Sequence, residues 1–307
     1  MLKNLKIGLC IPTLNAGDEW PNWLDMFLSQ NIKADVSLVI DSASNDQTVS
    51  LAKVAGLVIH QIDRASFNHG ATRQLGVSLM PDVDVVVFLT QDAILATNDS
   101  ITNLVSVFEN SSIGAAYGRQ LPRKTASYIE AHSRVFSYPD KSRINSFENS
   151  KKLGIKAAFI SNSFAAYRSK ALEEVGGFPL NTILGEDTYV AAKMLLHGWN
   201  VAYCSDAVVY HSHDYSYLEE FRRYFDIGVF HSRERWLRDQ FGQAEGEGMR
   251  YVLSELRYLM RRSPLLIPSV FLRTALKLVG YRLGLNEKNL PMKVKRFLSM
   301  HKSYWNI

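Results

Sequence analysis

Two adjacent carboxylates, Glu186 and Asp187, are well placed for chemistry, because they follow Gly185 and open a run with helical periodicity. Acidic residues at a helix start are also favoured by the helix dipole, so the pair can be purely structural. In the functional interpretation, one of them is a general base that takes a proton from a hydroxyl. Neighbouring helical residues point about 100° apart, so only one can face a given hydroxyl. The other would be structural or would bind an acceptor.

Asp92, His211 and His213 are the predicted metal ligands. The two histidines end a strand-like segment, and residues two apart on a strand share a face. A lone histidine is usually structural, whereas a pair in this position suits a metal ion or a phosphate. Asp92 follows the apolar run Val83–Thr90, and a carboxylate together with phosphate oxygens suits Mg²⁺ or Mn²⁺. Alternatively, Asp92 only caps a turn.

The segment Phe67–Arg73 (FNHGATR) predicts a helix start at which an anion could bind. Asn68 suits the N-cap position, Gly70 would let the backbone approach a ligand, and Arg73 lies one turn further along. Helix N-termini attract anions, so this segment is a candidate phosphate contact. The alternative is an ordinary capped helix whose Arg73 pairs with a nearby acid.

These residues belong to a chain that alternates short apolar runs with helical patterns. The runs are Lys6–Pro12, Val36–Asp41, Leu57–Gln61 and Val83–Thr90, with segments of helical length at about 18–30, 46–55 and 68–80. This alternation predicts a parallel sheet covered on both faces, with ligands at the carboxyl ends of its strands. Three of those ends are polar and read Thr13-Leu14-Asn15, Asp41-Ser42-Ala43-Ser44 and Thr90-Gln91-Asp92. One polar end is ordinary turn chemistry, but three at one edge predict a site.

The middle section, about 113–214, mixes strand-like and helical pieces. We expect a strand or strand pair at Ile155–Ala166, a helix over Leu184–Gly198, and short strands at Trp199–Tyr203 and Ala207–Tyr210. Beyond Tyr215 the pattern is helical. Residues 263–285 are apolar but carry charges, so no membrane span is predicted there. A basic, aromatic surface lying at a membrane interface is the better expectation.

Charge is unevenly distributed along the 307 residues, whose net charge is +5. Residues 215–307 hold 17 Lys and Arg against 9 Asp and Glu, whereas residues 1–214 hold 18 against 21. The basic third predicts contact with phospholipid, a diphosphate or nucleic acid, unless it is only a solvated helical face. The acidic remainder and the lack of a recognition motif argue against a nucleic-acid-binding protein.

The two cysteines, Cys10 and Cys204, lie in apolar runs and cannot form a disulfide framework. Buried thiols in a reducing compartment are the simplest interpretation. The N-terminal stretch has too short an apolar run, and no small-residue cleavage site, for a signal peptide. A cytoplasmic location is therefore expected.

Together these segments resemble the inverting family 2 glycosyltransferases of the GT-A fold, over most of residues 5–214. Ile11-Pro12-Thr13-Leu14-Asn15 looks like the family's first-strand signature, and Asp41–Thr48 (DSASNDQT) looks like its second-strand loop. In that loop Asp41 would hold the nucleotide base, with Asp46 nearby. Gly185-Glu186-Asp187 looks like the acidic catalytic motif, with Asp187 as the base. His211 falls where some members place a third metal ligand.

One departure concerns the metal position, where the family usually has Asp-x-Asp and this chain has Thr90-Gln91-Asp92. However, Thr90–Ala93 (TQDA) and the FNHGATR segment are similar to a bacterial rhamnosyltransferase subgroup. Gly280–Gly284 (GYRLG) and Leu298–Trp305 (LSMHKSYW) look like that subgroup too. The resemblance implies dTDP-β-L-rhamnose as donor, Mg²⁺ or Mn²⁺ as cofactor, and an acceptor glycan on a polyprenyl diphosphate or a lipopolysaccharide core. The basic C-terminal third would then face the anionic inner surface of the cell membrane.

The resemblance predicts an α/β fold of the GT-A type, with a mainly parallel central sheet flanked by helices. Residues 1–214 would form the catalytic domain, with nucleotide-sugar binding at about 1–112 and acceptor binding at about 113–214. Residues 215–307 would be a basic amphipathic helical extension, which could equally form a homodimer interface. The residues expected to contact the donor are Pro12, Thr13, Asn15, Asp41, Ser44, Asp46, Asn68, Gly70, Arg73, Gln91 and Asp92.

Two enzyme alternatives remain. The same fold could use another nucleotide sugar, such as a UDP-hexose or a UDP-N-acetylhexosamine. A nucleotidyltransferase would need a glycine-rich, basic loop after the first strand to bind a triphosphate. The loop Pro12–Gly17 carries no basic residue, which argues against that class.

Overall fold

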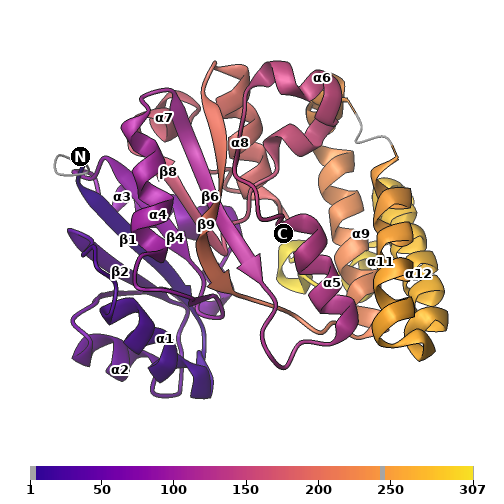
Figure 1. Cartoon of the computed structure of the whole chain (residues 1–307), viewed down its shortest axis with the longest axis horizontal. Helices are drawn as coiled ribbons and strands as arrows, with labels where there is room; N and C mark the ends of the chain where they lie inside the picture. Colours follow the sequence, from indigo (N-terminus) through magenta and orange to yellow (C-terminus); the bar gives the residue numbers. More distant parts are fainter. Residues whose placement is uncertain (1–4, 243–245, 307) are drawn as a thin grey trace.

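The computed structural model describes residues 5–242 and 246–306, so residues 1–4 of the N-terminal stretch lie outside the described residues. A nine-stranded sheet crosses the molecule, and a group of C-terminal helices packs beside it (Figure 1). The strand order is β3-β2-β1-β4-β8-β6-β9-β5, and β7 also pairs with β9. The strands are β1 (Ile7–Thr13), β2 (Val36–Asp41), β3 (Val58–Gln61), β4 (Val85–Leu89), β5 (Ile94–Leu95), β6 (Ile113–Leu121), β7 (Arg143–Asn145), β8 (Phe164–Arg168) and β9 (Asn200–Tyr210).

Helices cover both faces of the sheet, as the sequence predicts. The helices are α1 (Trp20–Leu28), α2 (Thr48–Val54), α3 (His69–Ser78), α4 (Ser100–Val105), α5 (Tyr128–Ser137), α6 (Ser150–Leu153), α7 (Ser169–Glu174), α8 (Glu186–Leu196), α9 (Tyr217–Arg233), α10 (Arg235–Phe241), α11 (Glu247–Arg262), α12 (Ile267–Leu285) and α13 (Met292–Leu298). Along β1, Leu9 and Ile11 join one apolar core while Cys10 joins the other. A strand buried on both faces must be apolar at nearly every position, which explains the unbroken apolar runs.

The two halves of the sheet differ in strand direction. The strands β3, β2, β1 and β4 are all parallel, whereas β8 runs antiparallel between β4 and β6.

The strand or strand pair expected at Ile155–Ala166 is only partly present. Residues 154–158 form a 3₁₀ helix, and the strand begins at Phe164. The two short strands expected around residues 199–210 are one strand, β9, with a shift in register against β6.

The C-terminal helices α9 and α12 pack with their backbones in contact. A Cβ atom on Gly284 would lie 2.0 Å from the carbonyl oxygen of Phe225, and one on Gly280 would lie 2.5 Å from that of Phe221. Glycine at both positions allows this close approach. Beside this contact, Glu220 of α9 forms ion pairs with Arg273 and Lys277 of α12, at 2.8 and 3.0 Å.

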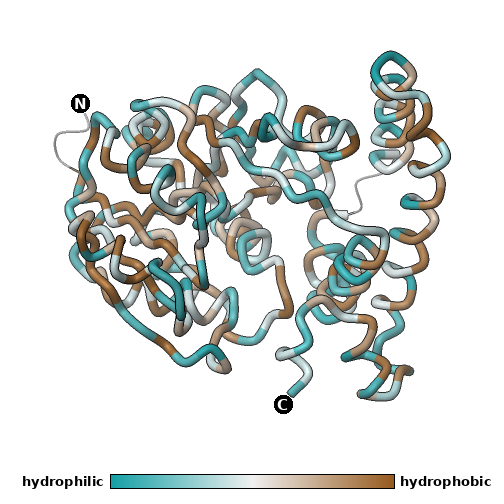
Figure 2. Tube along the Cα trace, turned by 90° about the horizontal axis from the view of Figure 1, so that it is seen from below, coloured by the Kyte–Doolittle hydropathy of each residue, from teal (hydrophilic) through white to brown (hydrophobic). Residues whose placement is uncertain are grey.

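Most exposed residues of α12 are apolar, because Arg273 and Lys277 are turned inward toward Glu220; Arg282, near the end of the helix, is exposed. Contrary to the expectation from the sequence, residues 264–285 form a helix long and apolar enough, by length and composition, to cross a membrane. Among the described residues it is the single helix of this kind. Figure 2 shows apolar residues along the outer helices as well as inside the sheet domain.

The C-terminal segment packs back against α9 and α3. Asp226 of α9 holds it, because one of its carboxylate oxygens accepts hydrogen bonds from the backbone N–H groups of Met300 and His301. The His301 ring then packs edge-on against the His69 ring, with centroids 5.0 Å apart.

Candidate active site

The carboxyl ends of β1, β2, β4, β6 and β9 all lie at one edge of the sheet, because these strands run in the same direction. Thr13, Asp41, Asp92 and His211 follow four of these strands or end them. The structure thus brings the polar strand ends predicted from sequence to one edge. This is where an open α/β sheet binds its ligands.

The loops after β1 and β2 hold each other through side-chain hydrogen bonds. Asp41 is fully buried, and its Oδ1 atom accepts hydrogen bonds from the Thr13 and Ser44 hydroxyls, at 3.0 and 2.5 Å. The backbone N–H of Asn15 donates to the Ser44 hydroxyl, and Asn15 has a positive φ of 45°. Asp46 accepts from the backbone N–H of Gly17. These contacts fix the two loops against each other, without showing which groups meet a ligand.

Gln91, just after β4, joins the first of these loops. Its side-chain amide donates to the Leu14 carbonyl and accepts from the Leu14 N–H, at 3.1 and 2.8 Å. The amide is therefore engaged with the backbone of the first loop. The structure supports a positioning role for Gln91 more directly than a contact with a ligand.

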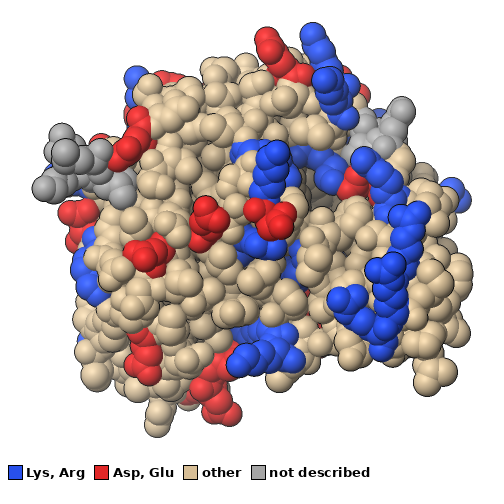
Figure 3. Space-filling model, viewed as in Figure 1, with Lys and Arg blue, Asp and Glu red and all other residues tan. Residues whose placement is uncertain are grey.

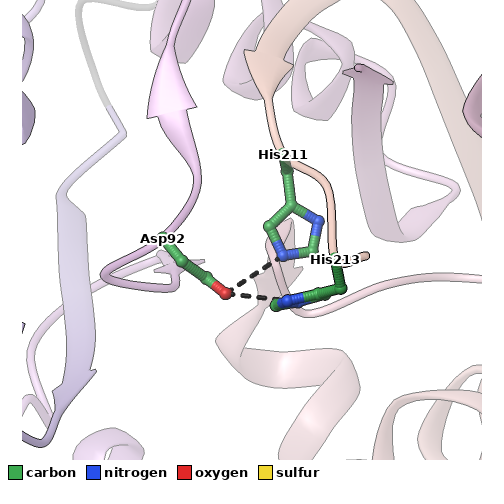
Figure 4. Close-up of side chains that lie close together, drawn as sticks. All are labelled: Asp92, His211 and His213. Atoms are coloured by element: carbon green, nitrogen blue, oxygen red, sulfur yellow. Dashed lines mark hydrogen bonds and ion pairs between the residues drawn. The ribbon is translucent and has the colours of Figure 1, made fainter. Parts of the chain in front are cut away.

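Asp92, His211 and His213 converge on one point (Figure 4). One oxygen of Asp92 lies 3.3 Å from Nε2 of His211 and 3.3 Å from Nε2 of His213. One potential ligand atom from each residue lies within 4.8 Å of the other two. The other Asp92 oxygen accepts a hydrogen bond of 2.6 Å from the Thr90 hydroxyl, which fixes the carboxylate.

Hydrogen bonding around His211 shows that these three atoms suit a cation. Nδ1 of His211 lies 2.8 Å from Oε1 of Gln120, an oxygen that also accepts a hydrogen bond from Arg134. Nδ1 must therefore carry the proton, which in the neutral ring leaves a lone pair on Nε2 facing Asp92. Two acceptors facing each other are stable only with a proton or a metal ion between them. Such an outer hydrogen bond commonly orients a metal-binding histidine.

The ionisation of Asp92 and His213 agrees with this arrangement. Burial alone would raise the pKa of Asp92; with a proton rather than a metal ion between the two groups, the hydrogen bond and charge of His211 lower it below the ordinary carboxyl value. Burial and the neighbouring His211 lower the pKa of His213 to about 4. At neutral pH the cluster therefore offers a carboxylate and an uncharged imidazole from His213.

Glu186 and Asp187 open helix α8 directly after Gly185. Gly185 has a φ of +75°, and a Cβ atom there would lie 2.9 Å from the Phe230 ring, so a side chain at this position would be strained and crowded. Glu186 is buried, pairs with Arg73 at 3.1 Å and accepts a hydrogen bond from the Asn162 side chain. The charge of Arg73 keeps the pKa of Glu186 below its ordinary value, although burial opposes this.

Asp187 has no cation of its own among the described residues. Its carboxylate accepts hydrogen bonds from the backbone N–H groups of Asn162 and Thr188. Burial and the adjacent negative charge of Glu186 raise the pKa of Asp187 to about 7. A carboxylate with this pKa is a strong enough base to accept a proton from a hydroxyl at neutral pH.

The helix start at α3 forms as predicted, but its arginine and glycine have other partners than a phosphate. The Asn68 side chain caps the helix by accepting from the N–H groups of Gly70 and Ala71. Arg73 is buried and paired with Glu186, as in the ordinary-helix alternative. A Cβ atom on Gly70 would lie 1.9 Å from the Pro179 carbonyl oxygen, so Gly70 makes room for protein backbone.

Gln120, Ser161 and Asn162 connect the histidine cluster to the carboxylate pair and were missed in the sequence. Gln120 contacts His211 and donates to the Ser161 hydroxyl at 2.9 Å. The next residue, Asn162, contacts both Glu186 and Asp187. Gln120 lies near the end of β6, so the rule of polar strand ends could have found it. No local signal marks Ser161 or Asn162.

Comparisons with known proteins find similar sequences over nearly the whole chain. The model of glycosyl transferase family group 2 matches residues 85–286. The chain is 51% identical to the O-antigen chain rhamnosyltransferase RfbN of Salmonella typhimurium, over 98% of this chain and 96% of the relative. It is 43% identical to the O-antigen chain rhamnosyltransferase WbaN of Salmonella anatum, over 97% and 95%.

Among solved structures, the chain is similar to the mannosyltransferase PcManGT from Pyrobaculum calidifontis, solved in complex with GDP-Man and Mn²⁺. The TM-score is 0.57 at 20% identity, over 98% of this chain and 85% of that one. A likeness at this identity concerns the fold alone, and it confirms the predicted α/β architecture of the GT-A type.

Proposed function

This chain belongs to glycosyl transferase family group 2, and we propose that it transfers L-rhamnose from dTDP-β-L-rhamnose to an O-antigen glycan. The observation that carries the reaction class is the high-pKa Asp187, at the same sheet edge as the Asp92, His211 and His213 cluster. The full-length likeness to two O-antigen chain rhamnosyltransferases supports the choice of sugar.

In the proposed reaction, Asp187 takes the proton of an acceptor hydroxyl while that oxygen attacks the anomeric carbon of the donor. The new carbon–oxygen bond forms as the bond from that carbon to the diphosphate breaks, and the nucleoside diphosphate leaves. Direct displacement inverts the anomeric carbon, so a β-linked donor gives an α-linked product. Glu186, held by Arg73 and Asn162, keeps the pKa of Asp187 high and positions the start of α8.

Asp92, His211 and His213 are the residues that would hold a divalent metal ion. One carboxylate and two imidazoles form a mixed oxygen and nitrogen set, which suits Mn²⁺ better than Mg²⁺, because Mg²⁺ prefers oxygen ligands. When bound, the metal would neutralise charge on the leaving diphosphate. An activity that survives EDTA unchanged would refute this assignment. After EDTA treatment, we expect added Mn²⁺ to restore the transfer activity at a lower concentration than added Mg²⁺.

We assign donor binding to about residues 1–112 and acceptor binding to about residues 113–214. In this proposal Pro12, Thr13, Asn15 and the loop from Asp41 to Asp46 bind the nucleoside. The fully buried Asp41 and its bonds to Thr13 and Ser44 support this role, since they fix the two loops against each other. Asn68, Gly70 and Arg73 would act indirectly, by placing α3 against Glu186.

The donor is tested by titrating the purified protein with dTDP, UDP and GDP in the presence of Mn²⁺, and then with the corresponding nucleotide sugars. The proposal predicts that dTDP-β-L-rhamnose raises the melting temperature most. Stabilisation by UDP-hexose or UDP-N-acetylhexosamine, without an effect of dTDP-rhamnose, would keep the fold and change the sugar.

We further propose that the C-terminal helices rest on an anionic membrane at its cytoplasmic face, where a lipid-linked acceptor would be found. Large apolar side chains on the outer side of α12 are exposed, namely Leu265 just before it and Phe271, Leu272, Leu278 and Val279 within it. Exposed basic residues flank them on α11 and α13, and Figure 3 shows such side chains gathered over α11. They include Arg257, Arg261, Arg262, Lys293 and Arg296. An apolar face bordered by cations suits an anionic lipid surface.

Vesicle flotation tests this surface. The protein should float with vesicles that contain anionic lipid and remain in solution with vesicles of zwitterionic lipid alone. The double change Phe271→Ser and Leu272→Ser should reduce flotation, whereas Val54→Ser, at an exposed valine on α2, should not. Loss of a dimer in the double variant, with no binding of either protein to vesicles, would instead identify the face as a homodimer interface.

A further inference from the structure

Arg223 on α9 is an exposed arginine with no acidic partner in the described part of the chain. It makes no ion pair or hydrogen bond with any described residue, unlike Arg73, Arg134 and Arg273, which all pair with glutamates. Its neighbour Arg222 lies over the Phe297 ring, 5.6 Å from the centroid. Two adjacent arginines of one helix thus contact different parts of the molecule.

The guanidinium of Arg223 lies close to the histidine cluster. It is 5.6 Å from the centroid of the Tyr215 ring, and Tyr215 stacks on His213 with centroids 5.4 Å apart. His213 in turn contacts Asp92. The aromatic contact restrains a long side chain that otherwise has no partner. Arg223 therefore stands next to the cluster that would hold the metal, on an element outside the sheet.

The charge of Arg223 is also felt across the site. Burial is the main cause that lowers the pKa values of His69 and His301, and the charge of Arg223 lowers both further. Burial raises the pKa of Tyr138, and Arg223 opposes that rise. The guanidinium thus lies within electrostatic reach of α3, of Tyr138 just after α5, and of the returning C-terminal segment. A cation without an acidic partner among the described residues therefore acts on three elements around the site.

We propose that Arg223 binds the diphosphate of a nucleotide substrate, from the side opposite the sheet. This inference rests on the proposed function, which supplies a nucleoside diphosphate as leaving group. The planar guanidinium can bond two phosphate oxygens at once, and it would balance negative charge that grows as the donor bond breaks. Thr90-Gln91-Asp92 supplies a single acid for a metal ion, so a cationic side chain could help the metal to balance the charge of the diphosphate. The C-terminal extension would then complete the donor site as well as support the fold.

Calorimetric titration with dTDP and dTMP, in the presence of Mn²⁺, tests the assignment. Arg223→Gln should weaken dTDP binding roughly tenfold, as expected for charge-assisted hydrogen bonds at a partly open position. Arg223→Gln should change the affinity for dTMP by no more than about twofold, since dTMP lacks the second phosphate. Arg223→Lys should recover part of the lost dTDP affinity. Arg222→Gln is the matched control and should bind dTDP like the unchanged protein. Because Arg223 is exposed, the melting temperature should not change.

Equal losses of dTDP and dTMP affinity would show a general structural effect and overturn the proposal. Unchanged dTDP binding, with a raised KM for a diphosphate-linked acceptor, would move Arg223 to the acceptor and also overturn it. If the unchanged protein binds no dTDP, the proposed donor fails instead. The same comparison made with UDP and UMP then decides the role of Arg223 alone.

Discussion

Two buried clusters of carboxylates in this chain differ in their balance of charge. At the site, Glu186 and Asp187 share one guanidinium, that of Arg73. Between the C-terminal helices, Glu220 and the nearby Glu255 face two cations, Arg273 and Lys277. The first cluster has an excess of negative charge and the second is balanced.

The difference separates a reactive group from a structural one. At the site, the unbalanced charge and burial raise the pKa of Asp187, so this carboxylate can take up a proton near neutral pH. Between the helices, the pKa of Lys277 is raised although burial alone would lower it, because Tyr224 and Glu220 favour its charged form. In this second cluster burial also raises the pKa of Glu255, but the charges of Lys277 and Arg273 oppose that rise, and the ion pairs of Glu220 join the two helices. An unbalanced cluster is costly to fold and is useful for proton transfer.

The largest effect should come from Asp187→Asn, which removes the base and keeps the shape. The rate of transfer should fall by about 10²- to 10⁴-fold, the usual contribution of a general base, while the affinity for donor stays nearly unchanged. Single-turnover assays together with nucleotide titration measure both quantities. Asp206→Asn, at an exposed acid, is the control. Full activity of the Asp187 variant would remove this residue from the mechanism.

Gly284→Ala tests the backbone contact that holds the balanced cluster together. The new methyl group would press on the Phe225 carbonyl, so the free energy of unfolding should fall by about 3 kcal/mol. Denaturant unfolding measures this change. Gly248→Ala on α11, where a Cβ atom meets nothing within 4 Å, should be neutral or slightly stabilising. Equal stability of the two variants would refute the close packing.

Glu220→Gln should have a smaller effect, because Arg273 and Lys277 keep the nearby Glu255 as a partner. We expect a loss of about 1–2 kcal/mol in the free energy of unfolding, with the rate of transfer per folded molecule unchanged. Urea unfolding and a transfer assay on the same sample provide the two numbers. A large loss of rate without loss of stability would mean that this cluster also takes part in catalysis.

Glu186→Gln should change mainly the pH dependence of the reaction. Because Asp187 acts as base only when ionised, the rate should rise with pH and level off near its pKa of about 7. Removing the neighbouring charge lowers that pKa, so the rate of the variant should level off at a lower pH. The measurement is kcat/KM from pH 5 to 9. Curves that level off at the same pH would show that Glu186 has no influence on the base.

Features fixed by local sequence could be predicted, and those fixed by distant partners could not. The unbroken run in β4 and the cap at Asn68 depend on neighbours in the chain, and both form as expected. The polar strand ends also meet at one edge, because strand direction alone decides this. The strand or strand pair expected at 155–166 forms only from Phe164, because periodicity in a short apolar run does not distinguish strand from helix.

The pairing of Arg73 with Glu186 joins residues more than a hundred positions apart. Sequence alone offered, as one of two alternatives, a pairing of Arg73 with a nearby acid, and it did not identify that acid. Asn162 and Arg223 gave no local signal at all, because their role follows from what the fold places around them. The sequence also did not show that Arg273 and Lys277 turn inward to pair with Glu220, which leaves mostly apolar side chains exposed on α12.

The most direct test of the account is the product itself. Purified protein, dTDP-β-L-rhamnose, Mn²⁺ and a lipid-linked O-antigen fragment should give a glycan extended by one rhamnose, and NMR should show an α-linkage. The Asp187→Asn protein should give almost none. A β-linked product would contradict displacement with inversion, and transfer from a UDP-sugar but not from dTDP-rhamnose would contradict the proposed donor.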